Sequence, residues 1–269
     1  MKKFLKNFMT GESLYDKTPT SLSDNQIYPQ VCLDAANDYR FFNEFRQNPT
    51  YLKILEHVTE NEGATYLEMI TQDSDLLRHM DKFRLNDMYG TPLVYNYPNV
   101  GAISPSTLRY IKVLSDLKKL FKSLDGLSIC EIGVGYGGQC RIINALYVPT
   151  SYCLVDIKPA LLLAQRYLDN YAVKSTFSYT TMNELDKTKY DLVISNYAFT
   201  ELSRNIQEIY LEKVILNSRC GYITYNDITP TEFNSYKLEE LLKIIPRSRI
   251  IEEVPLTHPN NCIIVWDTN

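Results

Sequence analysis

The sequence has few of the residues that usually mark a metal centre, a disulfide framework or a membrane span. It contains 269 residues with one tryptophan, three histidines and six cysteines, none of them in a C-x-x-C pair. No stretch approaches the roughly 20 apolar residues that a transmembrane helix needs, so no membrane span is expected. There is no H-x-x-x-H pattern and no dense carboxylate cluster, so no metal site is expected, although Asp227 with another acid could hold Mg²⁺.

The sequence also lacks a strong excess of charge. A net charge of −4 gives no general attraction to nucleic acid, so none is expected as a partner. Cys130, Cys153 and Cys262 lie in apolar runs and indicate small buried side chains in a reducing compartment rather than disulfides. The basic start of the chain is broken too early for a signal-peptide core. We therefore expect a cytoplasmic protein.

The chain divides into two regions of different character. Region 1–100 is polar, with helical stretches expected at 32–45, from Tyr51 to Val58 and at 63–80, followed by a loop at 87–101. We expect this region to form a helical cap that helps to bind an acceptor. Region 101–269 opens with Ser104 as a helix N-cap and Pro105 as the first helical residue.

Strands and helices then alternate along the second region. Alternation of this kind predicts an α/β fold with a Rossmann-like, mostly parallel sheet of seven strands and helices on both faces. The last two strands, separated by a short segment, are expected to form an antiparallel hairpin at the sheet edge. The predicted strands are 127–131, 152–155, 175–179, 190–195, 221–225, 249–254 and 262–266, and the predicted helices are 138–146, 159–170, 201–217 and 233–244.

A glycine-rich loop lies between the first predicted strand and the next helix. It reads Glu131-Ile-Gly133-Val-Gly135-Tyr-Gly137-Gly138, and such loops let a ligand approach backbone N–H groups closely. The glycine pattern alone also suits a dinucleotide enzyme. Glu131 favours S-adenosylmethionine instead, because a carboxylate there would repel a diphosphate but attract an ammonium and a sulfonium group.

The ends of the following strands supply further cofactor candidates. Asp156 ends the second strand, where an acid can accept hydrogen bonds from both ribose hydroxyls, although helix capping is an alternative. Met182 and Asn183 follow the third strand and are candidates for the adenine, with an ordinary turn as the alternative. Ser195 and Asn196 end the fourth strand and complete the predicted cofactor site.

The chain resembles the class I S-adenosylmethionine-dependent methyltransferases, and more narrowly the sugar O-methyltransferases, from about Tyr89 to Trp266. The segments that carry the resemblance are Gly101-Ala-Ile-Ser-Pro-Ser-Thr-Leu-Arg109-Tyr110, the glycine loop through Gln139, Ser195-Asn-Tyr-Ala-Phe-Thr-Glu201-Leu, Asn226-Asp227, and His258-Pro-Asn260 through Trp266. The resemblance implies transfer of a methyl group to a hydroxyl of a sugar, nucleotide sugar or glycan precursor. An N-methyltransferase on a small molecule or amino sugar, and a catalytically silent binding module, stay open as alternatives.

A sugar hydroxyl is a poor nucleophile, so a general base should accept its proton during methyl transfer. The candidates are Glu201, His258 and Asp227, in that order, while capping of a helix is the alternative for Glu201. His57 and His79 are interpreted as ordinary helix residues. The candidates for binding the acceptor are one cation and four aromatic residues: Arg109, Tyr95, Tyr97, Tyr136 and Tyr197.

Overall fold

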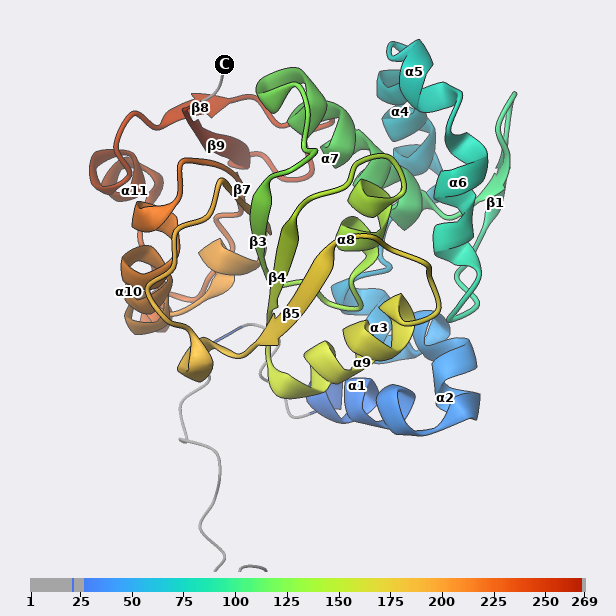
Figure 1. Cartoon of the computed structure of the whole chain (residues 1–269), viewed down its shortest axis with the longest axis horizontal. Coiled ribbons are helices and arrows are strands. Elements are labelled where there is room, and N and C mark those ends of the chain that lie inside the picture. Colours follow the sequence, from blue (N-terminus) through green and yellow to red (C-terminus); the bar gives the residue numbers. More distant parts are fainter. Residues whose placement is uncertain (1–20, 22–26, 268–269) are drawn as a thin grey trace, which may run out of the picture.

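A seven-stranded sheet organises the chain in the computed structural model, which describes residues 21 and 27–267 (Figure 1). The strand order is β5-β4-β3-β6-β7-β9-β8, in which β5, β4, β3, β6 and β7 are parallel and β9 is antiparallel to both of its neighbours. The strands span Ser128–Ile132 (β3), Ser151–Val155 (β4), Thr176–Thr180 (β5), Leu192–Asn196 (β6), Cys220–Tyr225 (β7), Arg249–Ile251 (β8) and Cys262–Trp266 (β9). The predicted fold class is therefore confirmed.

The predicted terminal hairpin at the sheet edge is confirmed. β8 and β9 are antiparallel, and β9 lies between β7 and β8, so that β8 is the outermost strand. The sequences explain this order. All five residues of β9 are buried, whereas Arg249 and Ile250 of β8 are exposed, and a strand buried on both faces belongs inside the sheet.

The central strands are almost continuously apolar because successive residues enter two different cores. Within β4, Tyr152 and Leu154 belong to the core on one face, while Cys153 and Val155 belong to the core on the other. The same alternation holds in β6 and β9, as expected for strands covered on both sides. All six cysteines are free and buried, in agreement with the sequence-based interpretation.

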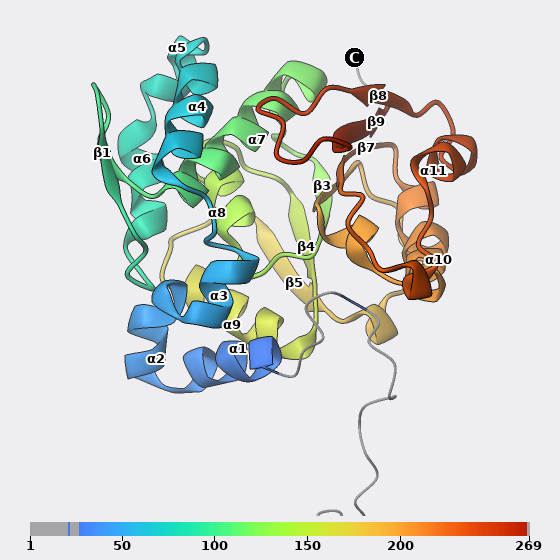
Figure 2. The ribbon, with the colours of Figure 1, turned by 180° about the vertical axis from the view of Figure 1, so that it is seen from behind.

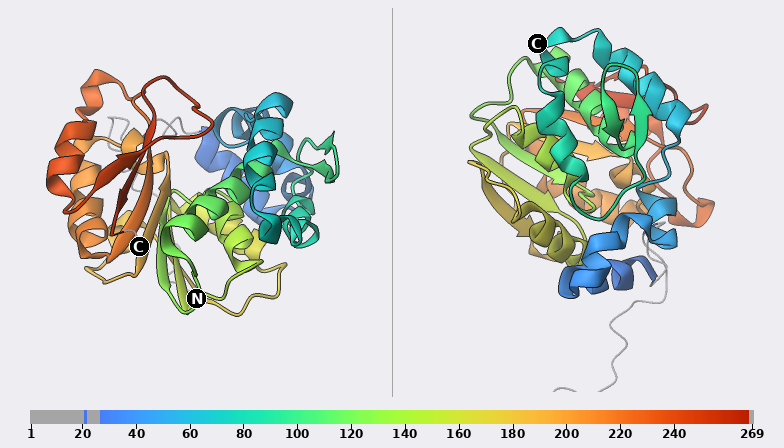
Figure 3. Two further views of the ribbon diagram at one scale, coloured as in Figure 1. Left: turned by 90° about the horizontal axis from the view of Figure 1, so that it is seen from above. Right: turned by 90° about the vertical axis from the view of Figure 1, so that its right-hand side faces the viewer.

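Helices cover both faces of this sheet, unequally. One face packs against α7 (Pro105–Phe121), α8 (Gly138–Asn144) and α9 (Lys158–Leu168), and the other packs against α10 (Arg204–Lys213) and α11 (Leu238–Ile244). Figure 3 shows the two sets on opposite sides of the sheet. The last two helices begin later than predicted, because short 3₁₀ turns occupy Ala198–Glu201 (η4) and Thr231–Phe233 (η6). Within the described residues, no helix is both long and apolar enough for a bilayer span.

The first 100 residues add further helices to the same side as α7, α8 and α9, as Figure 2 shows. These helices are α1 (Ile27–Asn37), α2 (Tyr39–Glu44), α3 (Pro49–Ile54), α4 (Glu60–Thr71), α5 (Ser74–Leu77) and α6 (Met80–Arg84), and a small hairpin joins β1 (Tyr95–Tyr97) to β2 (Gly101–Ile103). The prediction of one helix at 32–45 is wrong, since Asp38 N-caps a second helix. Asp73 divides the predicted helix at 63–80 in the same way.

The direction of the chain reverses between β3 and β6. From β3 the chain proceeds outward to β4 and β5, and then returns to β6, which lies on the other side of β3. Ligands of open α/β sheets bind outside the carboxyl ends of the strands at such a switch point. The residues that follow β3, β4 and β6 therefore define the place to look for a functional site.

Candidate functional site

The glycine loop at the end of β3 has a backbone that side chains would disturb. Gly133, Gly135 and Gly137 have φ values of 78°, 54° and 86°, in the left-handed region. A Cβ atom on Gly133 would lie 2.0 Å from Cβ of Ala198, and one on Gly135 would lie 2.8 Å from Cδ1 of Leu55. The loop thus lies directly beneath two other segments, the turn after β6 and the end of α3.

Glu131 is the acid of this loop, and it is almost completely buried, with 2% of its surface exposed. The Tyr152 hydroxyl donates a hydrogen bond of 2.5 Å to its Oε2. Burial, and then the nearby Asp156 carboxylate, raise the pKa of Glu131 to about 8, against the effect of the Tyr152 hydrogen bond. At neutral pH the group is mostly a neutral acid, and a cation beside it would make it ionise.

Asp156 flanks the same loop from the end of β4. Its Oδ2 accepts a 2.9 Å hydrogen bond from the backbone of Gly135, and its Oδ1 accepts one of 2.7 Å from Ile157. Burial raises the pKa of Asp156 to about 6, while these backbone donors lower it. The N-cap of α9 is Ile157, so Asp156 does not fill the helix-capping position that was its alternative role.

The segment after β5 holds the predicted adenine contacts. Met182 and Asn183 form a 3₁₀ turn with Glu184 (η3), closed by a capping box in which Thr181 and Glu184 bond each other's backbone N–H groups. Met182 packs partly into the core beneath α10, and Asn183 is exposed. Both residues lie at the carboxyl edge of the sheet, next to β4, which Asp156 follows.

The end of β6 combines a structural serine with an unpartnered amide. The Ser195 hydroxyl donates to the carbonyl of Ile132 and accepts from the N–H of Phe199, so it joins β3 to the turn after β6. Asn196 follows, and its Oδ1 is a buried acceptor without a hydrogen-bond partner among the described residues. Tyr197 has φ 68° and ψ −42°, an unusual conformation for a bulky residue that concentrates at functional sites.

Glu201 ends the turn η4 and faces the end of β7. Its Oε1 accepts a 2.7 Å hydrogen bond from Nδ2 of Asn226, and burial raises the pKa of Glu201 above its ordinary value. Since α10 begins only at Arg204, with Ser203 as N-cap, Glu201 lies outside the first turn that the capping alternative required. A partly buried carboxylate with a raised pKa suits general base chemistry.

The other two base candidates have different surroundings. Asp227 forms an ion pair of 3.0 Å with Nζ of Lys237. His258 is exposed in the loop between β8 and β9. A carboxylate held by a lysine and a solvent-exposed imidazole are weaker candidates than Glu201 for accepting a proton beside the cofactor loop.

Two of the tyrosines predicted to face an acceptor are buried, and a third lies in the outer hairpin. Tyr136 is fully buried and accepts a hydrogen bond from Asn86, so it offers no ring face to a sugar. Tyr97 packs against Gly63 of α4 and donates to the Glu60 carbonyl, and Tyr95 belongs to the same outer hairpin. Bulky aromatic residues can serve a core or a binding site, and only the packing distinguishes the two roles.

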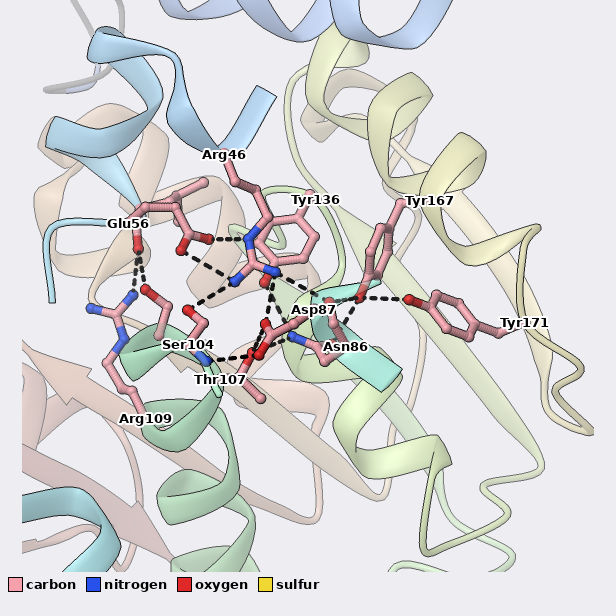
Figure 4. A network of polar contacts seen from close by, with 12 residues as sticks. Arg46, Glu56, Asn86, Asp87, Ser104, Thr107, Arg109, Tyr136, Tyr167 and Tyr171 are labelled. Carbon is pink, nitrogen blue, oxygen red and sulfur yellow. Dashed lines mark hydrogen bonds and ion pairs between the residues drawn. The ribbon is translucent and has the colours of Figure 1, made fainter. Parts of the chain in front are cut away.

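A buried polar network fixes the first region against the glycine loop (Figure 4). The Arg46 guanidinium forms ion pairs of 2.7 Å with Glu56 and 3.0 Å with Asp87, and lies 4.9 Å from the centre of the Tyr136 ring. Arg46 also donates to the hydroxyl of Ser104, the N-cap residue of α7. Residues far apart in the sequence thereby position the segment that carries Leu55 over the loop.

Arg109 and His57 meet beside this segment, and sequence reasoning gave His57 no role. Arg109 donates to the Leu55 carbonyl at 3.0 Å, and its Nη1 lies 3.5 Å from Nε2 of His57. Its guanidinium carbon lies 5.9 Å from the centre of the Tyr197 ring. Loss of hydration around the ring, and then the Arg109 charge, lower the pKa of His57 to about 4. No local sequence signal predicts this pair, because residues 57 and 109 meet only where the segment that follows α3 packs against α7.

No family model matches this sequence, and a search of curated proteins found no match. Among solved structures, the methyltransferase domain of bacterial CtHen1 is 13% identical, covers 59% of this chain and 96% of its own, and has a TM-score of 0.43. The magnesium protoporphyrin IX methyltransferase of Synechocystis PCC 6803 with bound SAH is 16% identical, covers 74% and 98%, and has a TM-score of 0.44. A 16S rRNA methyltransferase of T. thermophilus in complex with AdoMet and guanosine is 14% identical, covers 66% and 46%, and has a TM-score of 0.44.

Proposed function

We propose that this protein is an S-adenosylmethionine-dependent methyltransferase that transfers a methyl group to a hydroxyl of a sugar or glycan precursor. The observation that carries the cofactor assignment is a pair of acids, the buried Glu131 and the partly buried Asp156, on either side of a glycine loop at the switch point of the sheet. The cofactor supplies a methyl group on a positively charged sulfur.

The chemistry of the lining supports this cofactor over a dinucleotide. Asp156 and the unpartnered Oδ1 of Asn196 are acceptors, and Glu131 becomes one when a cation beside it makes it ionise, so the lining suits a ligand rich in donors and positive charge, such as an ammonium group and ribose hydroxyls. A diphosphate needs donors and positive charge, and it would be repelled by the Asp156 carboxylate and could not ionise Glu131. Glu131 would hold the ammonium group and Asp156 the ribose.

Glu201 is the proposed general base. Its carboxylate lies at the carboxyl end of the sheet, held by Asn226, and it would accept the proton of the attacking hydroxyl. Alignment of the hydroxyl with the methyl group supplies much of the acceleration of such a displacement. The sugar acceptor follows from the resemblance noted in the sequence. An amino-sugar acceptor would use the same cofactor site and is the second candidate.

Calorimetry with S-adenosylhomocysteine tests the cofactor assignment. The expected result is saturable binding that excess NAD does not displace. The Glu131→Gln variant should bind much more weakly, while Glu68→Gln, an exposed residue of α4, should bind like the wild type. Absence of binding to the folded wild type, or displacement by NAD, contradicts the assignment. Binding together with failure of every hydroxyl and amine acceptor tested would favour a silent binding module.

A further inference from the structure

Arg109 is a buried cation for which the described residues provide no counter-charge. It is 8% exposed, and no carboxylate of the described chain forms an ion pair with it. Its hydrogen-bonding contacts are the Leu55 carbonyl and the long contact to His57, although a guanidinium carries five N–H donors. Burial of a charge is costly unless it is paired and hydrogen-bonded.

The carboxylates nearest to Arg109 are committed to other groups. Glu56 pairs with Arg46, and Glu62 accepts from the backbone and hydroxyl of Thr59. Glu253, from the segment after β8, accepts from the Tyr197 hydroxyl and from Thr257. The remaining neighbours are aromatic or neutral, namely Tyr66, Tyr110, Tyr197 and, at neutral pH, His57. The guanidinium therefore keeps its charge and its free donors.

Arg109 also lies between the two parts of the proposed site. On one side it holds Leu55, whose side chain covers Gly135 of the cofactor loop. On the other side its guanidinium carbon faces the Tyr197 ring, directly after the end of β6. A group bound to Arg109 would therefore lie between the segment that covers the glycine loop and the turn after β6.

We propose that Arg109 binds an anionic group of the acceptor, a carboxylate or a phosphate, in a pocket completed by His57 and Tyr197. This inference rests on the proposed function and narrows its acceptor to acidic or phosphorylated sugars. A planar guanidinium suits the two oxygens of either anion, whereas a neutral sugar offers it no charge. Arg109 is thus a specificity-determining residue. A carboxylate and a phosphate would both bind it as anions, and experiment can tell which of the two the acceptor carries.

The test compares matched acceptors in the presence of S-adenosylmethionine, with release of S-adenosylhomocysteine as the readout. Glucuronic acid and glucose 1-phosphate are each paired with glucose, and UDP-glucuronic acid with UDP-glucose. We expect turnover of at least one anionic member of the panel and a far lower kcat/KM for neutral glucose. Preference for the uronic acids identifies a carboxylate, and preference for the phosphorylated sugars identifies a phosphate.

Variants of Arg109 give a second readout that does not require the right sugar. With S-adenosylhomocysteine bound, phosphate and acetate should raise the thermal midpoint of the wild type at constant ionic strength. Arg109→Gln should weaken this anion binding by about 10- to 100-fold, the worth of a charged hydrogen bond, and Arg109→Lys should retain part of it. Arg78→Gln, at an exposed residue directly after α5, should behave as the wild type.

The outcomes separate this inference from the proposed function. If the wild type and Arg109→Gln bind S-adenosylhomocysteine equally but respond equally to the anions, the anion pocket is refuted and the cofactor assignment stands. Equal turnover of glucose and its acidic partners would also refute it. If Arg109→Gln does not fold, Arg109→Lys decides. Shifts of its thermal midpoint by phosphate and by acetate that both equal those of the wild type would overturn the proposal. Failure of the wild type to bind S-adenosylhomocysteine refutes the proposed function instead.

Discussion

Replacement of Glu131 by glutamine should stabilise the fold and greatly weaken cofactor binding at the same time. The carboxyl group titrates near its usual value of 4.5 in an unfolded chain, but burial raises its pKa to about 8 in the folded protein. Folding therefore requires uptake of a proton at any pH between these values. Glutamine has nearly the same shape, can accept the Tyr152 hydrogen bond, and needs no proton.

The magnitude follows from the pKa difference. The folded state binds more protons than the unfolded state, so the contribution of Glu131 to stability is greatest below pH 4.5 and is lost as the pH rises toward 8. Each pH unit in this window costs about 1.4 kcal/mol. The glutamine variant should therefore exceed the wild type by about 3 kcal/mol at pH 7, and the difference should level off near pH 8.

Urea denaturation of both proteins at half-unit intervals from pH 5 to 8.5 measures this difference. The exposed Glu68→Gln variant is the control and should show a small, pH-independent change. Over the upper part of the same range, from pH 6.5 to 8, wild-type affinity for S-adenosylhomocysteine should rise about tenfold per pH unit, because binding requires the ionised carboxylate. A stability difference that is the same at pH 5 and pH 8 would refute the reasoning about burial.

Three further substitutions test other parts of the site. Gly133→Ala should destabilise the fold by more than Gly126→Ala in urea denaturation, because both glycines have a positive φ but only Gly133 meets another residue. Equal losses of unfolding free energy in the two variants would show that steric overlap with Ala198 has no role. Glu201→Gln should lower kcat by about 100- to 10,000-fold without changing S-adenosylhomocysteine affinity, and the raised pKa should place the acid limb of the wild-type kcat profile above pH 4.5. A variant with full kcat would exclude Glu201 as base. Glu56→Gln should cost about 2–3 kcal/mol of unfolding free energy, somewhat less than the loss of a lone buried partner, because a second carboxylate remains on Arg46. A decrease in unfolding free energy below about 1 kcal/mol would mean that the Arg46–Glu56 ion pair contributes little to stability.

Local sequence predicted the architecture of the second region and most of the residues that we propose for the cofactor. Apolar runs at regular intervals predict strands because central strands must be buried on both faces. Glycines at 133, 135 and 137, with acids at the ends of two strands, predict a ligand loop because the backbone geometry and the charges are set within a few residues. The sequence also contains the signals for Asp38 and Asp73 as helix caps, but hydrophobic periodicity obscured them.

Only the tertiary structure decided which residues can form the proposed acceptor site. Tyr136 and Tyr197 are both aromatic residues next to predicted strand ends, yet one is fully buried in the core and the other lies beside Arg109. His57 and Arg109 are 52 positions apart and meet because Arg46, Glu56 and Asp87 hold the first region against α7. A strand or a loop follows from the preferences of neighbouring residues. A charge without a partner can be recognised only when every group packed around it is known, because burial and pairing depend on contacts between distant segments.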